Sequence, residues 1–461
     1  MAFTKTQYNL SSDSMREMRR KHPRIIGLLA VMGIGVLVLV FFLVIEILVP
    51  VKLSLEEQPV IPKLISSVQP EVTLADSCLQ AIIDGVRFLD TQIQENGQFV
   101  YRVNLDPEVK IKPKYNLLRH SGTIYALADA AASIPQLRQD QELHSHFKNC
   151  ATFIKTQTLA PVPDTTGMLA VWSTPEITHG SGSRQAKLGG VGLALVALCS
   201  LERLSPGTTP LDTLQAMGRF ITYMQKEDGS FYSKFYPDGI GRSDTWTSLY
   251  YPGEAALGLI MLYELDQDPK WLASAVDVLK FLALSRIGKS RPKPDHWALI
   301  ATSRVWPFLD ANAFLQAKQV LLLNHAEQVS SRMLADIPRR MPGAGRGAML
   351  PDGRIAPQGT RLEGMLAMVP IFGELKPDLE VQIEKHTPAS IRFLLSGQVA
   401  DGVYKGGFTR VHPNYYPLAR RGGKSKTREM TELRIDVTQH SISALLTYLR
   451  NSHPDILAAQ S

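Results

Sequence analysis

Four carboxyl groups stand at the expected starts of separate helices, where one cleft could gather them. Glycoside hydrolysis usually needs two carboxyl groups, one protonated as the general acid and one ionised as the base or nucleophile. A carboxylate at a helix start can instead accept hydrogen bonds from free N–H groups and complement the helix dipole. Each of the four is therefore a candidate catalytic residue, with helix capping as the alternative: Glu254, Asp295, Glu363 and Asp436.

Histidines offer a second kind of acid–base chemistry. The triplet Asp295-His296-Trp297 places a carboxylate, an imidazole and an indole in succession, which suits proton transfer beside a stacked sugar ring. His120 and His440 stand near the starts of the first and the last of six expected inner helices. If these helices are neighbours, the two histidines could be the bases of an epimerase that removes a proton beside a carbonyl or carboxylate. A hydrogen-bonded structural role is the alternative for each.

The loops before these helices concentrate aromatic and cationic side chains. Aromatic rings stack on sugar faces, and arginines bind the carboxylates of acidic sugars. Any single one of these residues could simply rim a solvated loop, but their joint placement favours a cleft for a polysaccharide or glycoconjugate. The predicted substrate-binding residues are Arg119, Trp172, Arg242, Trp246, Tyr250, Tyr251, Trp297, Arg361 and Asp436.

Neither a cofactor nor a metal centre is expected from the motifs. The sequence has no Walker A loop and no G-x-G-x-x-G after a strand, so a nucleotide cofactor is not predicted. Cys78, Cys150 and Cys199 lack the spacing of zinc ligands and are expected to be buried thiols on helices. The formal net charge of +7 is not accompanied by a nucleic-acid recognition motif, so nucleic acid is not an expected partner.

The elements that must position these residues are helical hairpins, best seen in the segment 250–282. Glu254 to Leu265 is apolar nearly all round, as a helix enclosed by other helices should be, whereas the following helix carries its apolar residues in a stripe. Asp268 and Pro269 supply the new helix start. An inner and an outer helix therefore form a hairpin, which cannot bury its apolar faces alone.

The hairpin recurs along the chain. At three outer helix ends an apolar pair leads, seven residues on, to an Asn-Gly or Asp-Gly turn and an aromatic residue; these pairs begin at Phe88, Phe220 and Phe393, and weaker copies begin at Phe153, Phe281 and Met333. The inner helices are expected near Gly122, Gly189, Gly253, Asp295, Glu363 and Gln439. Six inner and six outer helices predict an all-α fold, a closed (α/α)6 toroid over residues 76–461.

Two features resemble known families. Gln225-Lys-Glu-Asp228-Gly229-Ser-Phe231 resembles the Q-x-x-D-G-x-F/W repeats of terpenoid cyclases and protein prenyltransferases. The hairpin count, together with GEAALGLIMLYEL at 253–265, resembles the six-hairpin glycosidases and the sugar epimerases that share their toroid. This resemblance implies a substrate funnel where the inner helices begin, although no catalytic signature carries over residue by residue. The acidic D-x-D-D motif of class II terpene cyclases is absent from the sequence.

The segment before the toroid predicts a membrane anchor. Residues 1–24 are polar and basic, and residues 25–49 form an apolar run, broken only by Glu46, that is long enough to cross a bilayer of about 30 Å. The positive flank places the N-terminus in the cytoplasm. A cleaved signal peptide is the alternative, but no small-x-small site follows the run. Residues 50–75, with four prolines, are expected to be an extracytoplasmic linker.

Together these features predict a single-pass membrane protein whose toroid lies in the periplasm or at the cell surface and acts on carbohydrate. A glycoside hydrolase-like enzyme is the favoured interpretation, and a sugar epimerase or lyase is the second. A non-catalytic toroid that binds glycan or scaffolds the cell envelope is the alternative from a different class. A glycosidase should present paired acidic groups across an aromatic-lined funnel, whereas a binder needs only the aromatic residues.

Overall fold

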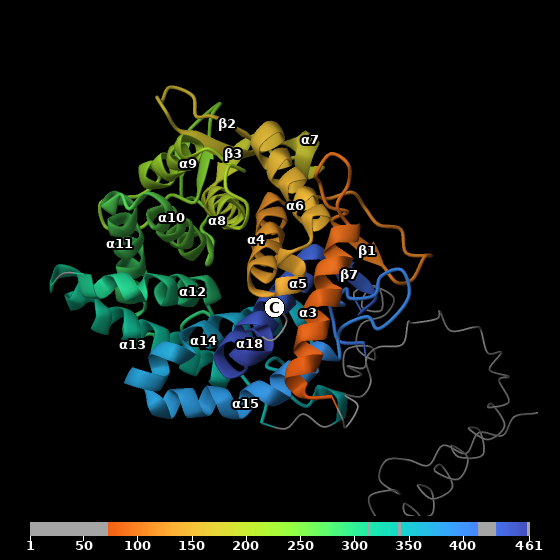
Figure 1. Cartoon of the computed structure of the whole chain (residues 1–461). Coiled ribbons are helices and arrows are strands. Elements are labelled where there is room, and N and C mark those ends of the chain that lie inside the picture. Colours follow the sequence, from red (N-terminus) through yellow and green to blue (C-terminus); the bar gives the residue numbers. More distant parts are fainter. Residues whose placement is uncertain (1–71, 312, 340–342, 414–429, 459–461) are drawn as a thin grey trace, which may run out of the picture. The chain divides into compact units, whose positions relative to one another are not determined.

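The computed structural model describes residues 72–311, 313–339, 343–413 and 430–458, and these residues are mostly helical (Figure 1). Six helices of this part of the chain form an inner ring: α4 (Leu117–Ser133), α8 (Leu188–Leu204), α10 (Tyr251–Asp266), α12 (His296–Val305), α14 (Ile355–Leu375) and α18 (Ile435–Ser452). Six outer helices alternate with them along the sequence: α3 (Leu74–Thr91), α6 (Gln141–Phe153), α9 (Leu211–Tyr223), α11 (Pro269–Arg286), α13 (Ala313–Ala335) and α15 (Pro377–Leu395).

The inner ring is closed. Each inner helix packs on the next in sequence order from α4 to α18, and α18 packs back on α4. The outer helices pack against the inner ones, and α15 contacts α3. The alternation of inner and outer helices that the sequence predicts is therefore present in the described residues. All six predicted outer helix ends, from Phe88 to Phe393, lie at or beside the last turn of an outer helix.

Glycines let the inner helices approach backbone to backbone. A Cβ atom added to Gly192 on α8 would lie 2.8 Å from the backbone nitrogen of Ala255 on α10, and one added to Gly258 would lie 2.8 Å from the carbonyl oxygen of Gly192. Real Cβ atoms are not found so close to other atoms. The small residues of the predicted inner helices are thus a steric requirement of this ring.

The turns after three outer helices also follow the sequence pattern. Gly97, Gly229 and Gly402 have φ angles of +83°, +85° and +76°, which glycine adopts without steric cost. In the first two copies the aromatic residue, Phe99 or Phe231, pairs back with Ile93 or Gln225 in an isolated β-bridge. In the third copy the corresponding bridge joins Gln398 to Phe408, later than the predicted Tyr404.

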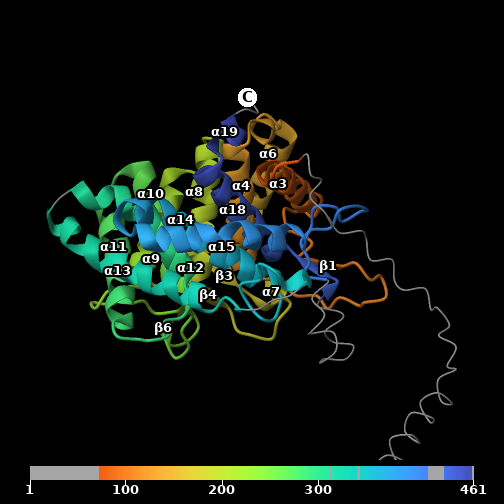
Figure 2. The same cartoon turned by 90° about the horizontal axis from the view of Figure 1, so that it is seen from below.

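Small antiparallel sheets are an addition that the sequence did not predict. A five-stranded sheet has the order β2-β3-β4-β5-β6, with β2 at Leu159–Pro161, β3 at Leu169–Ser173, β4 at Gln185–Lys187, β5 at Lys234–Tyr236 and β6 at Gly241–Ser243. A two-stranded sheet pairs β1 (Arg102–Asn104) with β7 (Glu432–Arg434). Figure 2 shows strands of both sheets gathered at one end of the helical ring. They pair the backbone of the long loops that precede α4, α8, α10 and α18.

Shorter helices complete the connections. They are α5 (Pro135–Arg138), the π-helix Ile154–Thr158, α7 (Pro175–Thr178), the 3₁₀ helices Trp306–Ala311 and Gly343–Gly345, and α19 (Pro454–Ala458). The three cysteines are free and buried, as expected.

Some predicted helix starts near the site come too late in the chain. The fifth inner helix is predicted near Glu363, but α14 begins at Ile355, which places Glu363 in the middle of the helix. The sixth is predicted near Gln439, but α18 begins at Ile435.

Pro357 lies in the first turn of α14, where a proline lacks only an N–H that would be unpaired anyway. Gly359 serves close packing, because a Cβ atom there would lie 2.9 Å from the carbonyl oxygen of His440.

The predicted membrane anchor lies outside the described residues, which begin at residue 72. The same holds for the basic segment 1–24 and for nearly all of the linker 50–75. Within the described part of the chain, no helix combines the length and the apolar character needed to cross a bilayer.

Candidate active site

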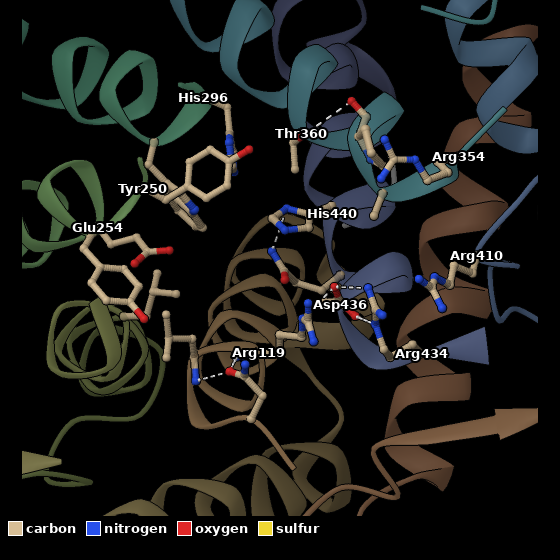
Figure 3. Close-up of a pocket in the computed structure, with 18 residues that line it drawn as sticks. Arg119, Tyr250, Glu254, His296, Arg354, Thr360, Arg410, Arg434, Asp436 and His440 are labelled. Atoms are coloured by element: carbon tan, nitrogen blue, oxygen red, sulfur yellow. Dashed lines mark hydrogen bonds and ion pairs between the residues drawn. The ribbon is translucent and has the colours of Figure 1, made fainter. Parts of the chain in front are cut away.

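A cavity of about 470 Å³ opens at the end of the ring where the inner helices begin (Figure 3). Its lining comes from the first two turns of all six inner helices or the residues just before them, and from one loop residue, Arg410. Eight of the predicted site residues line it: Arg119, Tyr250, Tyr251, Glu254, His296, Trp297, Asp436 and His440. Residues far apart in sequence, such as Arg119 and His440, thus meet at one cavity because the ring closes.

Two histidines face each other in this cavity. His296 is the first residue of α12 and His440 lies in the second turn of α18; their ring centroids are 5.4 Å apart at an interplanar angle of 79°. His296 is buried, and the ring of Tyr250 stands 5.0 Å from it, edge to face. Neither ring nitrogen of His296 has a hydrogen-bond partner among the described residues. An imidazole in this setting is available to a ligand.

Close packing of α14 fixes the positions of both histidines. A Cβ atom added to Gly364 would lie 2.8 Å from Cβ of His296, and Gly359 makes the equally close contact with the backbone of His440. Any larger residue at either position would push α12 or α18 away from α14. The distance between the two imidazoles therefore depends on two glycines of a third helix.

The carboxyl group of Glu363 contacts the imidazole of His440. Oε2 of Glu363 lies 2.9 Å from Nδ1 of His440, and the amide nitrogen of Gln439 lies 3.1 Å from the same ring atom. Burial raises the pKa of the Glu363 carboxyl, while the hydrogen bond and the charge of His440 act against that rise. Glu363 itself lines a second cavity of about 400 Å³, formed by the later turns of the inner helices. It orients His440 rather than facing the first cavity.

The histidine pair and Glu363 could also hold a metal ion. Ligand atoms of His296, Glu363 and His440 lie within 4.8 Å of one another. Two imidazoles and one carboxylate are a ligand set that suits first-row transition metals. An ion there would compete with the hydrogen bond between Glu363 and His440.

The pKa values of the two carboxyl groups that line the cavity are shifted in opposite directions. Burial, reinforced by the negative charge of Asp295, raises the pKa of Glu254 well above its ordinary value. Burial also acts to raise the pKa of Asp436, but the guanidinium groups of Arg119 and Arg434 outweigh it and hold that pKa below its usual range. Opposed shifts of this kind distinguish an acid from a permanently ionised group.

Both carboxylate oxygens of Asp436 form ion pairs with arginines. Nε of Arg119 lies 2.9 Å from Oδ2 of Asp436, and Arg434 contacts both carboxylate oxygens in a two-pronged ion pair. Arg434 precedes α18 directly, so the ion pair also ties β7 to the first turn of that helix.

Besides Glu363, two further predicted catalytic residues lie away from the cavity. Asp295 is fully buried; it caps α12 by accepting from the backbone N–H of Ala298 at 3.2 Å and pairs with Arg286 at 2.6 Å. His120 is buried against Tyr115, whose hydroxyl lies 2.7 Å from Nδ1, and burial lowers its pKa to about 4. Both geometries correspond to the structural alternatives considered for these residues.

Four predicted substrate-binding residues also lie outside the cavity lining. Arg361 points to the outer layer and pairs with Asp336 at 3.1 Å, because α14 starts earlier than predicted. Trp172 is buried in the five-stranded sheet, where Nε1 donates to the carbonyl of Ala160. Arg242 is exposed and stacks on tyrosine rings, whereas Trp246 is half exposed and stands 5.7 Å from the cavity residue Tyr251. Trp246 alone of these four adjoins the cavity.

Several cavity residues were missed by sequence reasoning. Arg354 and Arg434 precede α14 and α18 directly, so the rule that selected Arg119 would have found them had both helix starts been placed correctly. Arg410 lies in a loop after an outer helix, where no sequence signal marked it. The other cavity residues not predicted are Asn116, Leu118, Leu193, Ala356, Pro357, Thr360 and Gln439.

No family model matches the chain, and no curated protein does at the sequence level. Solved structures do match. A sugar epimerase from a ruminal bacterium superposes with a TM-score of 0.57 at 12% identity, covering 82% of this chain and 99% of the other. The chain is a six-hairpin toroid. The resemblance to six-hairpin glycosidases and sugar epimerases is thereby confirmed for the fold.

Two further solved structures share the toroid. Cellobiose 2-epimerase from Spirochaeta thermophila matches with a TM-score of 0.54 at 14% identity, covering 82% of this chain and 97% of its own. The α-mannanase BT2949 of Bacteroides thetaiotaomicron matches with a TM-score of 0.51 at 12% identity, covering 81% and 96%. At such identities the likeness establishes the toroid alone.

The raised pKa of Glu254 predicts a pH-dependent stability. Its unfolded-state pKa is about 4.3, so as the pH rises above that value the unfolded chain loses the proton first and the folded state loses stability relative to it. The Glu254→Gln variant, which does not titrate, should therefore gain stability relative to the wild type in thermal melts as the pH rises above about 4.3. The exposed Glu384→Gln should show no such trend. A constant difference between Glu254→Gln and the wild type would contradict this assignment.

Proposed function

We propose that this protein is a carbohydrate-active enzyme that removes and returns a proton at a sugar carbon, as an epimerase or isomerase does. The observation that carries the proposal is the pair His296 and His440, two imidazoles 5.4 Å apart in the cavity. The toroid shared with sugar epimerases is consistent with this chemistry but does not establish it.

The two imidazoles have unequal surroundings, which suits them to opposite roles. Burial, with the charge of His440 as a second cause, lowers the pKa of His296 well below its usual value, so its imidazole is neutral and can accept a proton. The carboxyl group of Glu363 beside His440 stabilises the positive charge that this imidazole acquires on protonation. We therefore assign the role of base to His296 and the role of proton donor to His440.

The proposed step balances without a co-reactant. His296 takes the proton from a carbon beside a carbonyl or carboxyl group, and the electron pair of the broken C–H bond moves onto that group's oxygen. His440 then delivers a proton to the planar intermediate, either to the opposite face of the same carbon or to the adjacent carbon. The first outcome inverts one centre. The second moves the carbonyl group, provided that the hydroxyl proton of the first carbon passes to the former carbonyl oxygen, and neither outcome changes the composition of the sugar.

Glycoside hydrolysis is the second candidate function. It is favoured by Glu254, whose raised pKa suits a general acid, together with the ionised Asp436. Both oxygens of Asp436 are held by arginines, which weakens the carboxylate as a nucleophile or base. The histidine pair has no comparable competing partner at His296 among the described residues. Proton transfer is therefore the better-supported reaction.

We also propose that the toroid is anchored to a membrane and works outside the cytoplasm. The support is the apolar run 25–49 with its basic flank at residues 1–24. Protease added to sealed, right-side-out membrane vesicles should digest the toroid, and alkaline extraction should leave the intact protein in the membrane. Protection of the toroid, or its release by alkali, would contradict the proposal.

Solvent exchange tests the proposed reaction. The purified protein is incubated in D2O with a panel of aldoses, ketoses, uronates and their oligosaccharides, and the recovered sugars are analysed by mass spectrometry and NMR. One substrate should gain a deuterium at a single carbon without cleavage of a glycosidic bond. His296→Gln and His440→Gln should each slow this exchange by about 10²- to 10⁴-fold.

A matched control uses the exposed His386 on α15, whose replacement by Gln should leave exchange unchanged. Glu363→Gln should slow exchange and shift its pH profile, since it alters the group that supports His440. Release of new reducing ends that persists in both histidine variants but disappears in Glu254→Gln would overturn the epimerase proposal in favour of hydrolysis.

A further inference from the structure

Four arginines line the cavity, and they come from separate elements. Arg119 lies in the first turn of α4, Arg354 and Arg434 immediately precede α14 and α18, and Arg410 belongs to the loop after α15. Figure 3 shows Arg354, Arg410 and Arg434 on the side of His440 opposite Tyr250 and Glu254. These four residues are called the arginine wall below.

Backbone pairing holds three members of the arginine wall on adjacent segments. The N–H of Ile355 donates to the carbonyl of Arg410 at 3.1 Å, and the N–H of Arg410 donates to the carbonyl of Glu432 on β7 at 2.8 Å. On the other side of β7, Arg434 lies directly opposite Arg102 of β1. Arginines on neighbouring extended segments repel one another, so the arrangement costs stability.

The carboxylates nearby offset this repulsion only in part. Asp352 pairs with Arg354 at 2.6 Å, Asp436 pairs with Arg119 and Arg434, and Glu432 lies 3.4 Å from Arg410 and 3.6 Å from Arg102. Among the described residues, these ion pairs join three carboxylates to five arginines. A guanidinium group does not lose its proton in proteins, so the four members of the arginine wall stay positively charged beside the cavity.

Two further features raise the positive potential. The helices α4, α10, α12, α14 and α18 all begin at the cavity, and each helix start contributes partial positive charge. The remaining carboxyl group of the lining, Glu254, has a raised pKa and adds little negative charge. A locally unfavourable charge arrangement that persists at a cavity is typical of a functional site.

We propose that the arginine wall binds the oxyanion of an acidic sugar, specifically the carboxylate of a uronic acid residue in an oligosaccharide or polysaccharide. This inference rests on the proposed function, because it names the substrate class of the same cavity. The planar fork of a guanidinium group matches a carboxylate with two parallel hydrogen bonds. Arg354, whose side chain is half exposed, is best placed to exchange its contact with Asp352 for one with a substrate.

Sulfate and phosphate esters of sugars carry oxyanions that a guanidinium also binds, so the experiment must separate these sources. Isothermal titration of the full-length protein would compare oligouronates of glucuronic, galacturonic and mannuronic acid with their carboxyl-reduced forms and with 6-O-sulfated forms of the reduced sugars. At least one oligouronate should bind about tenfold or more tightly than its carboxyl-reduced form. This preference should shrink as the ionic strength rises.

Arg354→Gln should weaken oligouronate binding about tenfold or more while leaving binding of the carboxyl-reduced form unchanged. Arg354 is partly exposed and outside the helical core, so the thermal unfolding temperature of this variant should stay near that of the wild type. The matched control is Arg87→Gln on α3, which removes an arginine with the same 50% side-chain exposure from its ion pair with Asp140. Arg87→Gln should bind oligouronates as the wild type does.

Equal binding of every oligouronate and its carboxyl-reduced form would overturn the inference, and tighter binding of the sulfated forms would overturn the assignment to a carboxylate. Other outcomes decide between this inference and the proposed function. If oligouronates bind through Arg354 but no sugar exchanges a proton, the arginine wall stands and the epimerase proposal falls. If only neutral sugars exchange deuterium, the epimerase proposal stands and the arginine wall assignment falls.

Discussion

The packing of α18 against α4 closes the inner ring, and the rest of the site depends on that closure. Residues from Arg119 to His440 meet at one cavity only because the last inner helix returns to the first. Closure in turn requires short distances between helices, which glycines such as Gly192 and Gly364 permit. A side chain at these positions would alter the ring and, through His296, the distance between the two imidazoles.

Burial and charge then give chemically similar groups different properties. His296 is buried without a hydrogen-bond partner among the described residues, whereas His440 is supported by the carboxyl group of Glu363. Burial acts to raise the pKa of both Glu254 and Asp436, but two guanidinium groups reverse its effect at Asp436 alone. The opposed pKa shifts of the two carboxyl groups, and the lowered pKa of His296, thus follow from where the ring places arginine and from where it buries side chains.

The alternation of inner and outer helices could be predicted from the sequence. The periodicity of apolar residues indicates how much of each helix is buried, and the inner helices are buried on more of their surface than the outer ones. The sequence also predicts which residues lie at the same end of the ring, since helix starts follow from the same pattern. It could not choose between His120 and His296, because both stand in first turns and only the rotation of each helix in the packed ring turns one toward the cavity. Arg361 was selected over Arg354 through an error of eight residues in one helix start. Arg410 depends on a loop pairing that no local pattern encodes.

The proposed proton transfer requires a neutral imidazole at His296, the histidine that the ring buries without a hydrogen-bond partner among the described residues. NMR of protein labelled with ¹⁵N in its histidines measures this directly, with His296→Gln and His440→Gln used to assign the two resonances. The imidazole of His296 should stay neutral as the pH falls below about 6.5, because burial lowers its pKa well below that usual value. Titration of His296 near pH 6.5, as in an exposed histidine, would contradict the proposal.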